Sequence, residues 1–134
     1  MTASDLLPSP VVLIVDDEPL VQNLLQGALD DGGFDVVVAS SDDEAFAALE
    51  ADGARNFVGV ITDVNLRCPR TGWDIARRAR SLCPTIPILY VTGDSEQEWA
   101  AQGVPSSMVI PKPFAPAQVM VALATLINRP RSDV

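Results

Sequence analysis

Four short apolar runs, rich in valine and isoleucine, recur along this chain, and each is followed by a charged or hydroxyl-bearing residue. Segments with helical periodicity separate the runs, and this alternation predicts a parallel β-sheet whose strands are connected by helices. Ligand sites in such sheets lie beyond the carboxyl ends of the strands. We therefore expect the residues after the runs to meet at one edge of the sheet: Asp16 and Asp17 after 11–15, Asp63 after 58–62, Thr92 after 86–91, and Lys112 after 108–111.

The connecting segments carry helix signals. Apolar residues at helical spacing predict a helix over 20–29, which Gly32 and Gly33 end. Two capping-box patterns predict further helices: Ser41 with Glu44 opens one to about Glu50, and Ser95 with Glu98 opens a short one that ends near Gly103. The other expected elements are a strand over 34–39, a helix over 73–82, and a last helix from Pro116 to about 127.

The strand order follows from which runs can be buried. The runs 11–15 and 58–61 are the most hydrophobic, which places them at the centre of the sheet with helices on both faces. Pro111 has no N–H to donate to a neighbouring strand, so the fifth strand belongs at an edge. With right-handed crossovers, these demands predict an α/β fold, a doubly wound five-stranded parallel sheet in the order 2-1-3-4-5 with five helices.

The composition indicates one folded domain. The chain has 134 residues, 48% hydrophobic and 20% charged, and its net charge of −9 argues against binding to nucleic acid. Cys68 and Cys83 form no disulfide or zinc pattern, and no signal peptide or long apolar span is evident. We therefore expect a soluble, cytoplasmic protein without membrane contact. A flexible arm is expected over 1–9, the domain over 10–128, and a short tail over 129–134.

The residues expected at the sheet edge suit a cation and a phosphoryl group. Three carboxylates held close together repel one another unless a cation is present, and Mg²⁺ takes oxygen ligands together with phosphate oxygens. Asp17, Asp63 and the backbone carbonyl of Asn65 are candidate ligands. A carboxylate beside a metal can attack phosphorus and form an aspartyl-phosphate. Lys112 would then pair with phosphoryl oxygens, and the Thr92 hydroxyl would donate to another.

Each of these residues also has a purely structural interpretation. Asp16 and Asp17 could form a helix N-cap, and Asp63 could be a turn residue. Thr92 could mark a transition from strand to turn, and Lys112 could protect an edge strand from aggregation. The joint occurrence of compatible chemistry at four strand ends favours a functional site.

Four motifs at these positions resemble those of the receiver domain of two-component response regulators: Asp16-Asp17-Glu18-Pro19, Ile61-Thr62-Asp63, Val91-Thr92-Gly93 and Lys112-Pro113-Phe114. The resemblance covers about residues 10–128. It implies a flavodoxin-like fold and the Mg²⁺-dependent phosphorylation of an aspartate by a histidine kinase or a histidine phosphotransfer protein. It also implies signalling through phosphorylation-dependent binding to a downstream protein. It does not imply an enzyme, beyond support of the protein's own phosphorylation and autodephosphorylation.

Carried over residue by residue, the resemblance implies that Asp63 is the phospho-acceptor and that Asp16 and Asp17 hold the metal with it. Lys112 and Thr92 would contact the phosphoryl group. The resemblance also implies that the peptide bond between Lys112 and Pro113 is cis. No effector domain follows residue 134, so a stand-alone receiver similar to chemotaxis regulators is expected.

The loop after Asp63 departs from the family pattern. Many receivers have a proline four residues after the acceptor and a glycine eight residues after it, but Arg67 and Thr71 stand at those places here. Pro69 and Gly72 come later in the loop. An altered or one-residue-longer loop is therefore expected.

The switch position is a second departure. Val109 stands where the family usually has an aromatic residue, three positions before Lys112. Val109 has no hydroxyl and little volume, so it cannot report phosphorylation as an aromatic ring would. We expect Tyr90 and the segment 93–103, which includes Trp99, to carry the conformational change instead.

Other functions share parts of this pattern. A phosphohydrolase of the haloacid-dehalogenase type also uses an aspartate nucleophile at a strand end, but it normally shows Asp-x-Asp where this chain has Asp63-Val64-Asn65. A nucleotide- or flavin-binding module would need a glycine-rich phosphate loop after the first strand, where residues 16–19 stand instead. An intermediate carrier in a phosphorelay would have the same site as a receiver that delivers an output.

Overall fold

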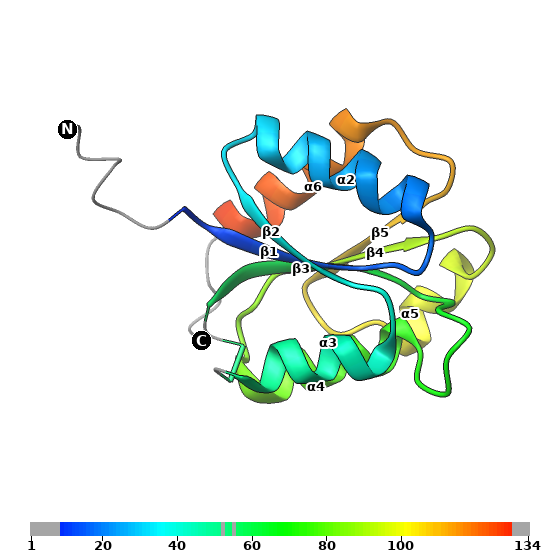
Figure 1. The fold of residues 1–134 in the computed structure, drawn as a ribbon. Helices are drawn as coiled ribbons and strands as arrows, with labels where there is room; N and C mark the ends of the chain where they lie inside the picture. Colours follow the sequence, from blue (N-terminus) through cyan, green and yellow to red (C-terminus); the bar gives the residue numbers. More distant parts are fainter. Residues whose placement is uncertain (1–8, 52, 55, 130–134) are drawn as a thin grey trace.

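The computed structural model describes residues 9–129 except 52 and 55. Its centre is a five-stranded parallel sheet in the order β2-β1-β3-β4-β5. The strands are β1 (Val11–Val15), β2 (Asp35–Ala39), β3 (Phe57–Asp63), β4 (Ile88–Thr92) and β5 (Ser107–Pro111). Helices α2 (Pro19–Asp31) and α6 (Pro116–Asn128) cover one face, and α3 (Asp42–Ala51), α4 (Gly72–Leu82) and α5 (Trp99–Gln102) cover the other (Figure 1). The predicted flavodoxin-like architecture and its strand order are confirmed.

Burial follows the predicted order of the strands. β1, β3 and β4 lie inside the sheet, and every side chain of β4 is buried. β2 and β5 form the two edges, and Pro111 lies on the edge strand that its missing N–H requires. The predicted strand and helix boundaries agree with the observed ones to within about two residues, as is usual where helix and strand ends fray. The exception is the short helix expected to open at Ser95, because α5 begins only at Trp99.

Two apolar layers fill the space between the sheet and the helices. The layer under α2 and α6 contains Ile14 and Leu29, and the layer under α3 and α4 contains Leu13 and Leu49. Ile14 and Leu13 enter opposite layers because successive side chains of a strand point to opposite faces. Each fully buried aliphatic side chain contributes about 1.5–3 kcal/mol by leaving water. The strands therefore form a well-packed platform that fixes the positions of the residues at their carboxyl ends.

The capping box predicted at Ser41 and Glu44 forms in part. The Glu44 N–H donates to Ser41 Oγ at 3.2 Å, as predicted. The Glu44 carboxylate accepts from the N–H of Ser40 at 2.8 Å rather than from that of Ser41. The pattern thus identified the start of α3 correctly, although the return hydrogen bond is shifted by one residue.

The capping box predicted at Ser95 and Glu98 is wrong. The Ser95 side chain makes no cap hydrogen bond, and Glu96–Glu98 forms a single 3-10 turn that leads into α5. Ser95 Oγ instead donates to Asp94 Oδ1 and accepts from the side chain of Asn65. A contact with the loop after β3 therefore replaces the local cap.

Two side chains join α4 to its surroundings. The Trp73 ring packs against Tyr90 with the ring centroids 4.6 Å apart. Burial lowers the pKa of Arg80, whose guanidinium donates to backbone carbonyls of the loops that precede β4 and β5. The acceptors are Ile86, Pro105 and Ser106.

The arm expected over 1–9 and the tail expected over 129–134 lie outside the described residues, apart from Ser9 and Arg129. None of the helices in the described part of the chain has the length and apolar content needed to cross a lipid bilayer. Cys68 and Cys83 are free thiols, as their spacing predicted.

Candidate functional site

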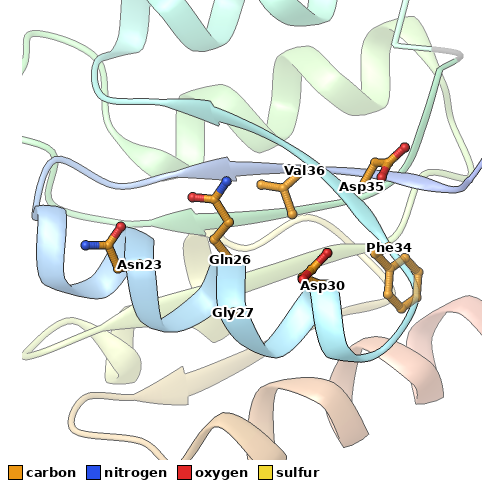
Figure 2. A pocket seen from close by; sticks show the side chains of 7 residues that line it. All are labelled: Asn23, Gln26, Gly27, Asp30, Phe34, Asp35 and Val36. Atoms are coloured by element: carbon orange, nitrogen blue, oxygen red, sulfur yellow. The ribbon is translucent and has the colours of Figure 1, made fainter.

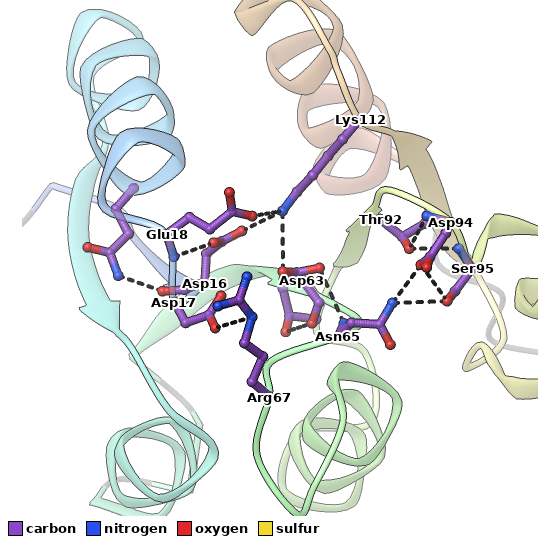
Figure 3. A network of polar contacts seen from close by, with 12 residues as sticks. Asp16, Asp17, Glu18, Asp63, Asn65, Arg67, Thr92, Asp94, Ser95 and Lys112 are labelled. Atoms are coloured by element: carbon purple, nitrogen blue, oxygen red, sulfur yellow. Dashed lines mark hydrogen bonds and ion pairs between the residues drawn. The ribbon is translucent and has the colours of Figure 1, made fainter.

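Four acidic side chains and one lysine meet at the carboxyl ends of the strands (Figure 3). Asp16, Asp17 and Glu18 follow β1, Asp63 ends β3, and Lys112 follows β5. One carboxylate oxygen of each acidic residue lies within 4.8 Å of those of the other three. We call these four residues the acidic cluster. The sheet thus brings together residues up to 96 positions apart in the sequence.

Lys112 is the cation at the centre of the acidic cluster. Its Nζ donates to Asp16 Oδ2 and Asp63 Oδ2, each at 3.2 Å, and to Glu18 Oε1 at 3.0 Å. Only 17% of the lysine side chain is exposed, so Lys112 does not act as a solvated guard of the edge strand. The Lys112–Pro113 peptide bond is cis, as the family resemblance implied.

Burial sets the charge state of the acidic cluster. Burial raises the pKa of Asp63 to about 6; the ammonium of Lys112 opposes this shift, and the charge of Asp16 adds to it. Burial also raises the pKa of Asp16. For Lys112, burial disfavours the charged form, but the hydrogen bond to Glu18 and the charges of Asp63 and Asp16 outweigh it and raise the pKa. One ammonium does not neutralise this many carboxylates, so the site favours a further cation.

The donor set fits a hard divalent cation. All four side chains offer carboxylate oxygens, the ligand type that Mg²⁺ prefers. Asp16, Asp17 and Asp63 were candidate ligands from the sequence, and all three lie in the acidic cluster. The Asn65 N–H donates to Asp63 Oδ1 at 3.3 Å, which places the Asn65 backbone beside the acceptor. Glu18 was given no role from the sequence, although its position next to Asp17 was a signal that could have found it.

Asp16 combines a structural contact with its place in the acidic cluster. Glu18 is the N-cap residue of α2, and its side chain makes no cap hydrogen bond. Asp16 Oδ1 accepts from the Glu18 N–H at 2.8 Å, while Asp16 Oδ2 accepts from Lys112. The helix-start interpretation of this residue is therefore compatible with the functional one, because each uses a different carboxylate oxygen.

Thr92 and Asn65 connect the cluster to the segment after β4. Thr92 Oγ1 accepts from the N–H groups of Ser95 at 3.0 Å and Asp94 at 3.4 Å. The Asn65 side-chain amide donates to Asp94 Oδ1 at 2.8 Å and to Ser95 Oγ at 3.0 Å. Thr92 is fully buried and, among the described residues, makes no hydrogen bond to the acidic cluster. Thr92 is connected to Asp63 by hydrogen bonds through the segment after β4 and Asn65.

The loop between β3 and α4, residues 64–71, is anchored on α3 by Arg70. The Arg70 N–H and Nε each donate to Asp42 Oδ2 at 3.1 Å, and Nη2 donates to Asp43 Oδ1 at 2.6 Å. The guanidinium also lies 3.8 Å from the centroid of the Phe46 ring. Burial would raise the pKa of Asp42, but the hydrogen bonds and charge of Arg70 outweigh it and lower that pKa. Sequence reasoning did not find this anchor, because nothing local pairs residues 28 positions apart.

The same loop differs from the family pattern where the sequence indicated. Arg67 has a left-handed φ of 56°, and its Nε lies 3.8 Å from Asp17 Oδ2. Gly72 begins α4 directly against the acceptor, since a Cβ there would lie 2.1 Å from the backbone oxygen of Asp63. Thr71 precedes it as the N-cap of α4. Glycine is therefore required at Gly72, one position later than in the family pattern. This position is the one expected if the loop is one residue longer.

Two hollows on the surface lie apart from the acidic cluster. One of about 640 Å³ lies between α2 and β2 and is lined by polar side chains that include Gln26 and Asp30 (Figure 2). The other, of about 460 Å³, lies over β5 and α6 and is lined mainly by apolar side chains such as Met108 and Val121. Neither is lined by a predicted site residue, so the candidate site is the acidic cluster with Lys112.

Comparison with known proteins identifies one family. A family model described as the response regulator receiver domain matches residues 12–124. The C4-dicarboxylate transport transcriptional regulatory protein DctD of Rhizobium meliloti is 32% identical over 110 residues, which are 80% of this chain and 23% of DctD. The chain spans between 23% and 49% of the length of the curated relatives considered.

Solved structures agree with the family model. A response regulator receiver protein from Sinorhizobium medicae has a TM-score of 0.86 and 36% identity, and the match covers 90% of this chain and 96% of that one. The receiver domain of the sensor histidine kinase PA1611 from Pseudomonas aeruginosa has a TM-score of 0.74 and 20% identity over 90% of this chain and 98% of that one. That second structure, which supports the fold alone, has a magnesium ion coordinated in its active site cleft.

Proposed function

The chain belongs to the response regulator receiver domain family, and from this premise we propose that Asp63 accepts a phosphoryl group from a histidine kinase or a histidine phosphotransfer protein. Receiver domains are signalling modules rather than classical enzymes. The observation that carries the proposal is the place of the Asp63 carboxylate. It is almost fully buried, 3.2 Å from the Lys112 ammonium, and beside the carboxylates of Asp16 and Asp17.

Asp63 is the nucleophile in this proposal. One of its carboxylate oxygens attacks the phosphorus of a phosphohistidine, the P–N bond breaks, and the bonding pair returns to the imidazole, which then takes a proton. Asp63 must be ionised to attack. With a pKa of about 6, it is about nine-tenths ionised at pH 7. Lys112 already donates to Asp63, so its ammonium is in place to pair with the incoming phosphoryl oxygens.

Asp16, Asp17 and Asp63 would hold Mg²⁺, with the backbone carbonyl of Asn65 as a further ligand. The all-oxygen donor set supports this assignment. The receiver domain of PA1611, which shares the fold, has a magnesium ion in its active site cleft. When bound, the ion would offset the repulsion among the carboxylates and the charge on the phosphoryl group. We also propose that this site supports autodephosphorylation of the phosphorylated Asp63.

Thr92 would bind the phosphoryl group and report its presence. Its oxygen accepts two backbone N–H groups, and its hydroxyl hydrogen has no acceptor among the described residues. That hydrogen is available to donate to a phosphoryl oxygen. Because the same oxygen holds the N–H groups of Asp94 and Ser95, movement of Thr92 toward Asp63 would rearrange the start of the segment 93–103. A downstream protein that binds this surface would then distinguish the two states.

The first experiment is labelling with acetyl phosphate in the presence of Mg²⁺, followed by intact-mass measurement. We expect one added phosphoryl group on the wild type and none on Asp63→Asn. Asp35→Asn, an exposed substitution on the edge strand β2, is the matched control and should be labelled like the wild type. Undiminished labelling of Asp63→Asn would overturn the assignment.

A second assay separates a receiver from a phosphohydrolase. The haloacid-dehalogenase type normally has a second aspartate where this chain has Asn65, and the Asn65 side chain here is engaged with Asp94 and Ser95. Sustained hydrolysis of a generic phosphomonoester, abolished by Asp63→Asn, would support the phosphohydrolase instead. Transfer from a phosphorylated histidine phosphotransfer protein, followed by onward transfer, would identify a phosphorelay intermediate.

A further inference from the structure

Arg67 adds a second cation to the rim of the acidic cluster. Its Nε lies 3.8 Å from Asp17 Oδ2, and Figure 3 shows the side chain extending from the loop after β3 toward Asp17. A carboxylate oxygen of Asp17 in turn lies within 4.8 Å of one of Asp63. The guanidinium is therefore next to a candidate metal ligand, and that ligand lies next to the proposed acceptor.

The backbone of the loop holds Arg67 at this place. On one side, the Asn65 side chain donates hydrogen bonds to Asp94 and Ser95. On the other side, Arg70 is bonded to Asp42 through its N–H and its guanidinium. Between these two anchors Arg67 adopts a left-handed φ of 56°, which a residue with a Cβ adopts only at a cost. The anchors therefore determine where the Arg67 side chain begins.

The two cations of the site differ in their freedom to move. Lys112 is 17% exposed and donates to three carboxylates, so it is fixed within the acidic cluster. The Arg67 side chain is 85% exposed and has a single long contact with Asp17. An exposed pair of this kind contributes little to the stability of the fold. Arg67 can therefore leave Asp17 at little cost when a better acceptor arrives.

We propose that Arg67 makes Mg²⁺ binding depend on the phosphoryl group. This inference rests on the proposed function of the acidic cluster. Without a phosphoryl group, the guanidinium occupies the vicinity of Asp17 and repels a cation there. A phosphoryl group on Asp63 brings additional negative charge and oxygen acceptors, and the planar guanidinium binds such oxygens with two parallel hydrogen bonds. Arg67 then moves from Asp17 to the phosphoryl group, which releases Asp17 for the metal.

Mg²⁺ titration of the unphosphorylated protein, followed by amide chemical shifts, tests the first half of the proposal, that Arg67 weakens Mg²⁺ binding when no phosphoryl group is present. We expect Arg67→Ala to bind Mg²⁺ about fivefold more tightly than the wild type at low ionic strength, with a smaller difference in high salt. Arg67→Lys keeps the charge and should stay close to the wild type. Alanine retains a Cβ, so the left-handed backbone is no easier to adopt. An unchanged urea midpoint would show that the fold is intact.

Arg78→Ala is the matched control for net charge, because Arg78 is on α4 and pairs with Glu50 outside the acidic cluster. It should leave Mg²⁺ affinity unchanged. Equal affinities of the wild type and Arg67→Ala would overturn the proposal, and so would an equal gain in Arg78→Ala. These titrations contain no phosphoryl donor. They therefore stand even if labelling of Asp63 fails, which separates the two hypotheses.

Beryllofluoride, which mimics the phosphoryl group, tests the second half of the proposal, that Arg67 moves from Asp17 to the phosphoryl group. In its presence, Arg67→Ala should bind the Mg²⁺–beryllofluoride pair several-fold more weakly than the wild type, because the guanidinium contact is lost. Arg67→Lys should also bind it more weakly, because an ammonium cannot make the two parallel hydrogen bonds. If both variants bind the pair as tightly as the wild type, Arg67 does not move to the phosphoryl group and the proposal is wrong.

Discussion

Asp63 and Asp42 are both buried carboxylates, 4% and 5% exposed, yet their pKa values move in opposite directions. Asp42 has its own arginine and accepts three hydrogen bonds from Arg70 and Asp43 that outweigh the effect of burial. Asp63 shares one ammonium with Asp16 and Glu18, so burial prevails and raises its pKa to about 6.

The difference between the two carboxylates separates a structural role from a functional one. Arg70 with Asp42 is a closed pair that fixes the loop after β3 on α3. The charges around Asp63 are not balanced within the protein, and a cation or a phosphoryl group with its counter-ions can bind there. Buried groups with strongly perturbed pKa values concentrate at functional sites for this reason.

The largest effect is expected from a substitution that displaces Asp63. Gly72→Ala places a Cβ 2.1 Å from the Asp63 backbone oxygen, so the start of α4 or the end of β3 must shift. We expect a loss of about 3 kcal/mol of stability in urea unfolding and poor labelling by acetyl phosphate. Gly27→Ala is the matched control, because nothing lies within 4 Å of its added Cβ. It should stabilise helix α2 by about 0.5–1 kcal/mol. An unchanged midpoint for Gly72→Ala would contradict this close packing.

Removing the charge of Asp63 or of Asp42 should change the free energy of unfolding in opposite directions. Asp63→Asn takes away a buried charge that the fold leaves poorly compensated, and it should raise the free energy of unfolding at pH 7 by about 1–3 kcal/mol. Asp42→Asn weakens the hydrogen bonds to Arg70 and should lower the free energy of unfolding. Urea unfolding of both variants checks the pair of signs. A destabilised Asp63→Asn variant would show that Lys112 compensates Asp63 fully.

The pH dependence of stability should also differ between Asp63 and Asp42. The pKa of Asp63 rises from 3.8 to about 6 on folding, so the folded state binds more protons between these values. The contribution of Asp63 to stability therefore falls as the pH rises through this range. Asp42 acts in the opposite sense: its contribution is present above its ordinary pKa and is lost as the pH falls below it.

Unfolding measured from pH 3 to 7 checks these slopes. The excess stability of Asp63→Asn over the wild type should shrink toward pH 4, and the deficit of Asp42→Asn should shrink in stronger acid. A pH-independent difference for Asp63→Asn would mean that its carboxyl group has an ordinary pKa in the folded protein.

The smallest expected effect concerns how the site reports its state. Thr92→Ala removes one hydroxyl donor, so we expect acetyl-phosphate labelling to slow by about fivefold or less. Beryllofluoride should change the amide chemical shifts of residues 90–103 most strongly in the wild type and in the control Thr92→Ser. Thr92→Ala should largely lose these changes. Because the Tyr90 ring is fully buried and its hydroxyl accepts from the Val104 N–H, the changes should centre on 93–103. Changes concentrated elsewhere would refute this switching model.

Much of the architecture was predictable from local patterns. Apolar runs with polar ends located the strands and the residues at their carboxyl ends, and Pro111 identified an edge strand. These predictions succeed because strand burial and the missing proline donor are properties of short segments. The capping box at Ser95 failed because Asn65, thirty positions earlier, offers the serine hydroxyl a different partner.

Local sequence patterns were enough to predict the order of the strands, the family, and which side chains could reach one edge of the sheet. How those side chains share their charges depends on the folded arrangement. Glu18 joined the acidic cluster through Lys112, Asp63 acquired a raised pKa by burial, and Asp42 acquired a lowered one through Arg70. Periodicity and propensity act over a few residues, whereas a pKa depends on every charge and every water molecule excluded within several ångströms of the group, whatever its distance along the chain.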